Sequence, residues 1–186
     1  MPNDWNLRYD EWIIGDGEPD RSVGDIFDWF AVEFWSREGL AKVNEDAKSA
    51  TAIPNFEYKV SAEVVCLSEK ACIIDFGVRA VGSRNTLPSG CQEGDYVEGK
   101  IGIGIPLCTD VVPTQFLKGY RWRVNRISAD LTPLLPGTGM RDYSRSQYQL
   151  VDSTESVKTH SYILHCSEVA EGSSASVLVV GASEDS

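Results

Sequence analysis

The chain has 186 residues, of which 42% are hydrophobic and 24% are charged, so it has enough apolar material for a core and is not a disordered acidic tail. Its 28 acidic and 17 basic residues give a formal net charge of −11, which repels nucleic acid and anionic membranes at long range. No apolar run reaches the length of about 18 residues that a membrane span needs.

The N-terminus and the cysteines indicate the compartment. Residues 1–7 are polar and show no basic stretch followed by an apolar one, so we expect no signal peptide. The number of cysteines is odd, their spacings are long, and no two of them form a C-x-x-C pair: Cys66, Cys72, Cys91, Cys108 and Cys166. This pattern predicts free thiols in a cytoplasmic protein, with neither a zinc site nor a thioredoxin-type site.

The first third of the chain is acidic and rich in aromatic residues. Residues 25–35 favour a strand because they combine aromatic and β-branched side chains, although their length also permits a helix capped by Ser22 or Asp25. Residues 36–50 are polar and predict a short helix or a connector. We therefore expect a separate N-terminal β lobe over residues 1–50.

The middle of the chain alternates apolar and polar residues with a period of two. This alternation predicts one strand over 58–66 and another over 72–81, joined by a short hairpin loop at 68–70. A loop rich in glycine, serine, proline and asparagine follows over 82–94. The next strand, 95–105, contains Gly99, Gly102 and Gly104, which indicate a tight bend or the close approach of another backbone.

Further strands are predicted in the last third. Residues 116–127 place Tyr120 and Trp122 on one face and Arg121 and Arg123 on the other. A loop follows over 131–139, and then three short strands are predicted at 147–152, 160–166 and 176–180.

One sequence pattern occurs twice. An I-I-x-x-G segment at 13–17 precedes Gly24-Asp25 and an apolar run, and a second at 73–77 precedes Gly94-Asp95 and another apolar run. The pattern indicates either a diverged duplication of a small β unit or two turns of a common type.

Residues 58–105 resemble the first half of an OB-fold barrel of the nucleic-acid-binding type. The likeness is carried by the strand 58–64, the strand 71–77 that ends in Asp-Phe-Gly, and the strand that opens within 93–101. The resemblance implies a small closed barrel. We therefore predict a mainly β protein with one or two small OB-like or SH3-like barrels and little helix. A barrel-like domain would cover 51–182, and a polar tail 183–186.

The sequence carries no motif for a specific reaction. It has no G-x-S-x-G elbow, and its two histidines, His160 and His165, are five residues apart and so face opposite sides of a strand. The acidic turn 16–20 lacks the spacing of a calcium loop, and the glycines of 99–104 lack the helix and the lysine of a phosphate loop. We predict a protein without catalysis, cofactor or metal.

Two binding functions remain, and each has its own candidate residues. In the leading hypothesis an acidic, aromatic-bearing surface binds a basic protein, in the manner of an inhibitor or immunity protein. Its contact residues would be Trp12, Asp16, Glu18, Asp20, Asp25 and Asp28. In the alternative, a basic and aromatic strand of an OB-like barrel binds nucleic acid. Its residues would be Lys118, Tyr120, Arg121, Trp122 and Arg123.

The basic band around that strand also has a simpler interpretation. Residues 114–149 carry a net charge of +4 within an acidic chain. Such a band can pack beside an acidic face of the same protein, since mixed surfaces are the norm.

Overall fold

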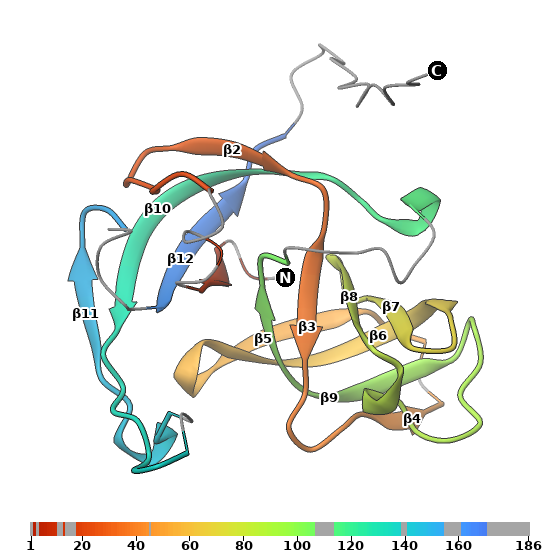
Figure 1. Cartoon of the computed structure of the whole chain (residues 1–186). Helices are drawn as coiled ribbons and strands as arrows, with labels where there is room; N and C mark the ends of the chain where they lie inside the picture. The colour runs from red at the N-terminus through yellow and green to blue at the C-terminus, as the bar shows by residue number, and fades with distance from the viewer. Residues whose placement is uncertain are drawn as a thin grey trace, which may run out of the picture.

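A closed five-stranded β-barrel forms one half of the protein (Figure 1). The computed structural model describes residues 2, 4–10, 13, 18–44, 46–106, 114–138, 141–154 and 161–170. The barrel strands are β3 (Val32–Trp35), β6 (Glu57–Leu67), β7 (Ala71–Asp75), β8 (Arg79–Ser83) and β9 (Tyr96–Gly104). They follow the order β9-β3-β8-β7-β6, and pairing of β6 with β9 closes the barrel. Two short strands extend it: β4 (Ala41–Val43) pairs with β9, and β5 (Ser49–Ile53) pairs with β6.

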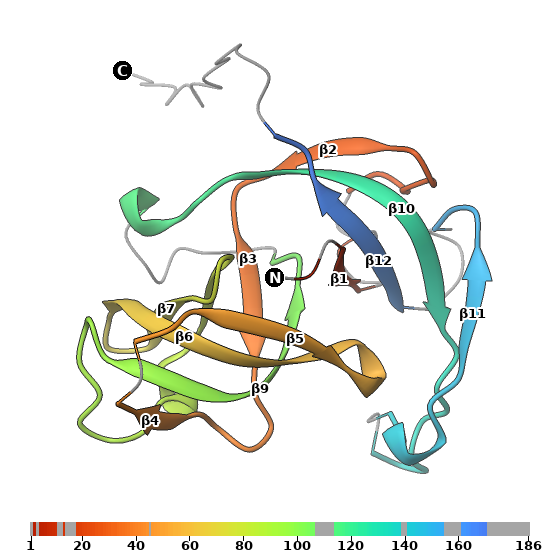
Figure 2. The ribbon, with the colours of Figure 1, turned by 180° about the vertical axis from the view of Figure 1, so that it is seen from behind.

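An open antiparallel sheet forms the other half, as Figure 2 shows from behind. Its order is β11-β10-β12-β1, from β11 (Tyr148–Val151), β10 (Tyr120–Asp130), β12 (Ser161–Glu168) and β1 (Trp5–Tyr9). A further strand, β2 (Ile26–Trp29), pairs with the start of β10. The two sheets meet where Arg8 of β1 lies beside Gly104 of β9 in a parallel contact.

Within the described ranges, four 3-10 turns of three residues lie between the strands: η1 (Pro54–Phe56), η2 (Arg84–Thr86), η3 (Thr114–Phe116) and η4 (Tyr143–Arg145). The prediction of a mainly β protein with a small barrel and little helix is therefore confirmed. In the described part of the chain, no helical segment has the length and hydropathy of a membrane span.

One hydrophobic core is shared by both sheets. It extends from Trp5 and Leu7 of the open sheet to Val60 and Ile74 of the barrel. Two buried tyrosine hydroxyls cross between the halves: Tyr58 accepts a hydrogen bond from the backbone N–H of Asn6, and Tyr120 accepts one from that of Arg79, each at 2.6 Å.

The expected division at residue 50 does not coincide with a boundary between the sheets. The strands of the first fifty residues are spread over both halves, since β1 pairs with β12, β2 with β10, and β3 with β8 and β9. The strand β5 itself runs across residue 50.

One strand prediction needs correction, and one of two alternatives is decided. Residues 72–81 form a hairpin rather than one strand, because Gly77 adopts φ +101° and donates its N–H to the Asp75 carboxylate at 2.9 Å. Its apolar residues still reach the core, because the three-residue loop preserves their alternation. Of the short helix and the connector predicted over 36–50, the helix is not found in residues 36–44 and 46–50, which contain β4 and the start of β5.

The other predictions of secondary structure are confirmed within the described residues. Residues 25–35 are extended and form β2 and β3, with a break at Phe30. The predicted strands at 58–66, 95–105, 116–127, 147–152 and 160–166 correspond to β6, β9, β10, β11 and β12. The strand predicted at 176–180 lies outside the described residues.

The two Gly-Asp turns have the same geometry. Gly24 and Gly94 both adopt positive φ, and both donate their N–H to a valine carbonyl at 2.8 Å, that of Val124 or Val64. Each valine precedes an irregularity in the register of its strand. The second half of the repeated pattern is thus matched in structure, whereas residues 14–17 of its first half lie outside the described residues.

Candidate functional site

The acidic candidates that the structure describes cluster near the start of β2. Glu18 pairs with Arg21 at 3.4 Å, and the Asp25 carboxylate accepts the N–H of Ser22 at 2.7 Å, so both have partners within the chain. Asp20 is exposed and accepts a hydrogen bond from Thr154 at 3.3 Å. Asp28 is exposed as well, over 75% of its side chain. Trp12 and Asp16 lie outside the described residues.

Apolar side chains are exposed at the same place. Among the described residues, six large hydrophobic side chains are exposed, and three of them lie on β2 or beside it: Val23 at 47%, Ile26 at 43% and Phe30 at 46%. The others are Leu134, Leu135 and Leu150. Ile26 and Asp28 alternate along β2 with the buried Phe27 and Trp29, so they share its outer face. Phe30 lies just beyond the strand, and its ring stacks on that of Trp29 at 5.6 Å between ring centroids. An apolar and acidic surface therefore lies at one end of the open sheet.

The predicted basic strand is the start of β10, which lies beside β2. Tyr120 and Trp122 are buried and stacked at 5.2 Å between ring centroids, so their faces are not open to bases. Arg121 and Arg123 are exposed, and they lie opposite Asp28 and Ile26 across the ladder. Nearby, Lys118 pairs with Glu168 at 3.4 Å. Arg121 and Arg123 of one predicted site thus lie beside Asp28 of the other, in agreement with the simpler interpretation of the basic band.

Charge is nearly balanced in the described part of the chain. It contains 20 acidic and 16 basic residues, a net charge of −4, so most of the total of −11 comes from outside the described residues. On β2 and the turn that leads into it, however, the exposed charges are acidic, those of Asp20 and Asp28.

The backbone of β10 shows which of its groups point toward β2. Val124 accepts a hydrogen bond from the N–H of Gly24 and donates one to the carbonyl of Asp25, so both of its groups face the β2 side. Arg121 accepts from the N–H of Val169, just beyond β12, so its carbonyl faces the other side. Alternate residues of an antiparallel strand bond to alternate neighbours. Residues 120, 122 and 124 therefore bond to the β2 side.

The register then identifies the free groups of β2. Phe27 and Trp29 lie opposite residues 122 and 120, so their N–H and C=O groups are used by β10. Ile26 and Asp28 alternate with them and direct their N–H and C=O groups the other way. No other strand within the described ranges pairs with β2, so this edge is free.

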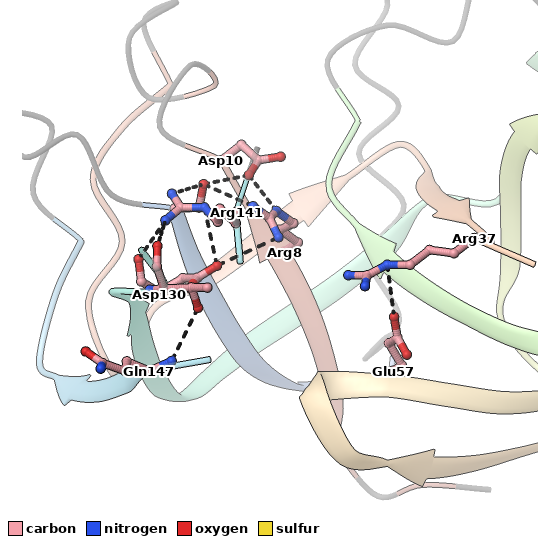
Figure 3. A network of polar contacts seen from close by, with 9 residues as sticks. Arg8, Asp10, Arg37, Glu57, Asp130, Arg141 and Gln147 are labelled. Atoms are coloured by element: carbon pink, nitrogen blue, oxygen red, sulfur yellow. Dashed lines mark hydrogen bonds and ion pairs between the residues drawn. The ribbon is translucent and has the colours of Figure 1, made fainter. Parts of the chain in front are cut away.

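A second polar feature lies where the two sheets meet (Figure 3). Arg8 Nε is 2.7 Å from Asp10 Oδ1, and its Nη1 is 3.9 Å from Asp130 Oδ2. Arg141 Nε is 3.6 Å from the same oxygen, and its Nη1 donates to the carbonyls of Asp130 and Thr132. The buried Oδ2 of Asp130 is stabilised by two guanidinium charges rather than by a hydrogen bond. We call these four charged residues the inter-sheet network.

Glu33 of β3 faces this network from the barrel. Its carboxyl has a pKa raised to about 7, first because it is buried and second because Asp10 is near, while Arg8 opposes the shift. The group is therefore partly protonated at neutral pH, which reduces the repulsion between two neighbouring carboxylates.

His165 carries a buried hydrogen-bond chain on the same face of the open sheet. Its Nδ1 is 2.7 Å from Asn6 Oδ1, and its Nε2 is 2.9 Å from Ser128 Oγ. Burial, and secondarily the charge of Arg126, lowers the pKa of His165 to about 4, so the ring is neutral at pH 7. The order serine, histidine, asparagine is that of a nucleophile, a base and an orienting group. Ser128 and His165 are only 4% and 3% exposed, however.

A small cleft opens beside this chain. Its lining includes Asn6, Arg8, Trp35, Phe56 and Tyr148, but neither Ser128 nor His165. Phe56 packs edge-on against Tyr148 at 4.6 Å and against His165 at 5.3 Å between ring centroids. A molecule in the cleft would therefore not contact the serine or the histidine.

The rim of the cleft carries a separate ion pair. Arg37 lies 3.7 Å from Glu57, apart from the inter-sheet network (Figure 3). A wider groove crosses the outer face of the barrel, lined by polar residues that include Ser49, Lys59 and Glu98. Neither feature brings a nucleophile and a base together.

The described cysteines are free and buried: Cys66, Cys72, Cys91 and Cys166. Burial raises the pKa of each thiol, so none of these four is an activated nucleophile. The described residues contain no group of three or more His, Cys, Asp or Glu side chains placed to hold a metal ion.

Sequence reasoning missed the inter-sheet network and the exposed Ile26 and Phe30. Alternation would have revealed only part of this. Residues 5–9 alternate buried and polar side chains, which places Arg8 opposite the core but does not identify its partners, and residues 26–29 place Ile26 on the face of Asp28. Comparison with protein-family models, with curated proteins and with solved structures finds no match to this chain.

Proposed function

We propose that this chain is a non-enzymatic binding protein that engages a basic protein partner, as an inhibitor or immunity-type protein does. The observation that carries the proposal is the outer face of β2, where Ile26 and Asp28 are exposed together and the exposed Phe30 follows just beyond the strand. An exposed apolar patch bordered by charged residues is typical of a protein interface. Acidic groups at its edge speed the approach of a basic partner.

The buried free thiols also bear on where the protein works. Four cysteines lie unpaired in the described part of the chain, as in proteins of reducing compartments. We infer that the protein acts in the cytoplasm.

The proposal is tested by affinity capture from a lysate of the source cell, with and without nuclease, followed by mass spectrometry. We expect a basic protein to be retained in both samples and released by high salt. Asp20→Asn with Asp28→Asn should weaken retention. The matched control, Glu69→Gln with Glu98→Gln, removes two exposed acids of the barrel and should leave it unchanged.

Two results would contradict the proposal. Retention that disappears after nuclease treatment would favour nucleic-acid binding through Lys118, Arg121 and Arg123. Equal retention by the wild type and by the variant at Asp20 and Asp28 would show that β2 is not the contact surface.

A further inference from the structure

We propose that an extended, basic segment of the partner adds to the free edge of β2 as a further strand of the open sheet. This inference rests on the proposed function and names the mode of recognition. A free strand edge offers unpaired N–H and C=O groups, and natural proteins usually protect such edges. Recognition by strand addition uses these main-chain groups for affinity and the alternate side chains for specificity.

β2 is a short edge strand with one charged side chain, that of Asp28, and its backbone edge is uncovered in the described chain. Ile26 and Asp28 direct their backbone N–H and C=O groups away from β10, and no strand of the described chain covers them. The strand contains no proline or lysine, and its register with β10 is continuous over its four residues. The edge is therefore open to pairing along its whole length.

The side chains on this edge define the segment that would fit. Ile26 and Asp28 project from one face of β2. A strand laid beside β2 places its own alternate residues next to these two. The complementary segment therefore carries a lysine or arginine with an apolar residue two positions away.

The charges near the edge support a basic occupant. Asp28 is 75% exposed, and Asp20 precedes the strand on the same stretch of chain. The arginines lie one strand further in, on β10, where Arg121 is 3.7 Å from Asp28. A cationic side chain that approaches the free edge therefore meets Asp28 before it meets Arg121.

The experiment uses the full chain and a fluorescein-labelled peptide of about ten residues in which threonine alternates with lysine and valine, a pattern suited to an extended strand. Binding is followed by fluorescence anisotropy at low and at high salt. Asp28→Pro removes the outward N–H but no hydrogen bond to β10, and Asp28→Asn removes only the charge. Leu150→Ser, at an exposed residue of β11, is the control.

We expect Asp28→Pro to weaken peptide binding at least about tenfold at both salt concentrations, because strand addition needs the main-chain edge. Asp28→Asn should weaken binding at low salt only, and Leu150→Ser should leave it unchanged. If Asp28→Pro does not fold, Ile26→Thr with Phe30→Ser replaces it, since these changes keep the edge and remove the apolar contacts. Their expected effect is also a loss of affinity.

Wild-type affinity in Asp28→Pro, or no binding of the peptide to the wild type, would overturn strand addition. Either result can coexist with salt-sensitive capture of a basic protein from the lysate. In that case the proposed function stands and only the mode of recognition fails.

Discussion

Asp28 on β2 lies directly opposite Arg121 on β10, with Oδ1 of the aspartate 3.7 Å from Nε of the arginine. Both side chains are more than half exposed, so solvent screens the pair and its contribution to stability is small. The pair matters for recognition instead, because Arg121 reduces the negative charge that a basic partner meets.

Arg121→Ala should therefore strengthen binding of the basic peptide. Removing the guanidinium leaves Asp28 without its counter-ion, and an exposed pair of this kind is worth up to about 1 kcal/mol, or roughly fivefold in affinity. Anisotropy at low salt measures the change. Arg145→Ala, at an exposed arginine of η4, is the matched control and should have no effect. Weaker binding by Arg121→Ala would place the contact on β10 rather than on β2.

Gly102→Ala should destabilise the pairing of β3 with β9 in the barrel. A Cβ at Gly102 would overlap the indole of Trp35, so the ring or the strand β9 must move. Overpacking of this kind costs about 2 kcal/mol in the free energy of unfolding. Gly119→Ala is the control, because the nearest atom to its Cβ, the carbonyl oxygen of Trp29, is 3.6 Å away. Urea unfolding of both variants measures the difference, and equal stability would contradict the close packing of Trp35.

Asp130→Asn should be far more costly than Asp10→Asn. Asp130 has 1% of its side chain exposed and compensates two arginines, whereas Asp10 is 21% exposed. Breaking a buried ion pair costs about 3 kcal/mol in the free energy of unfolding, and a more exposed one less than about 1 kcal/mol. Chemical denaturation of both variants tests the comparison. Similar losses in the free energy of unfolding for the two variants would mean that Asp130 does not hold the inter-sheet network together.

Glu33→Gln should stabilise the protein at alkaline pH and have little effect at acidic pH. The pKa of Glu33 is raised from 4.5 to about 7 in the folded state, so the folded protein binds this proton more tightly than the unfolded chain. The wild type therefore loses stability as pH rises from 4.5 to 7, and the loss is complete above pH 7. The difference in the free energy of unfolding between the variant and the wild type should therefore rise by about 2 kcal/mol from pH 5 to pH 8, a figure reduced for solvent screening of the carboxyl group. A pH-independent difference between the two proteins would show that Glu33 has an ordinary pKa.

Much of the barrel could be predicted from the sequence because its strands bury only one face. Residues 58–66 alternate strictly, and the structure buries the predicted side chains from Tyr58 to Cys66. The alternation could not show that the register shifts after Val64, which moves Cys66 into a second, smaller apolar cluster on the outer face of the barrel. Apolar contacts of Val65, Phe116 and Leu117 cover that cluster.

The hairpin at 71–83 shows a different limit. Its apolar residues alternate across the turn as they would along one strand, so periodicity alone does not distinguish the two. The deciding feature is the local bond from the N–H of Gly77 to the Asp75 carboxylate, together with the positive φ of Gly77.

The candidate surface was predicted only in part. Asp28 and Arg121 were each singled out, but for different functions, because nothing in the sequence places residues 28 and 121 side by side. Their pairing depends on a long-range contact between β2 and β10. The inter-sheet network was not predicted for the same reason, since Arg8, Asp130 and Arg141 come from distant parts of the chain.

The central claim, that a basic partner pairs with the free edge of β2, is tested most directly by hydrogen exchange of single backbone amides. In the free protein, the N–H groups of Ile26 and Asp28 should exchange fast, and those of Phe27 and Trp29, which bond to β10, should exchange slowly. With the basic peptide or the captured partner bound, the amides of Ile26 and Asp28 should become protected. Unchanged exchange at both residues in the saturated complex would contradict the account.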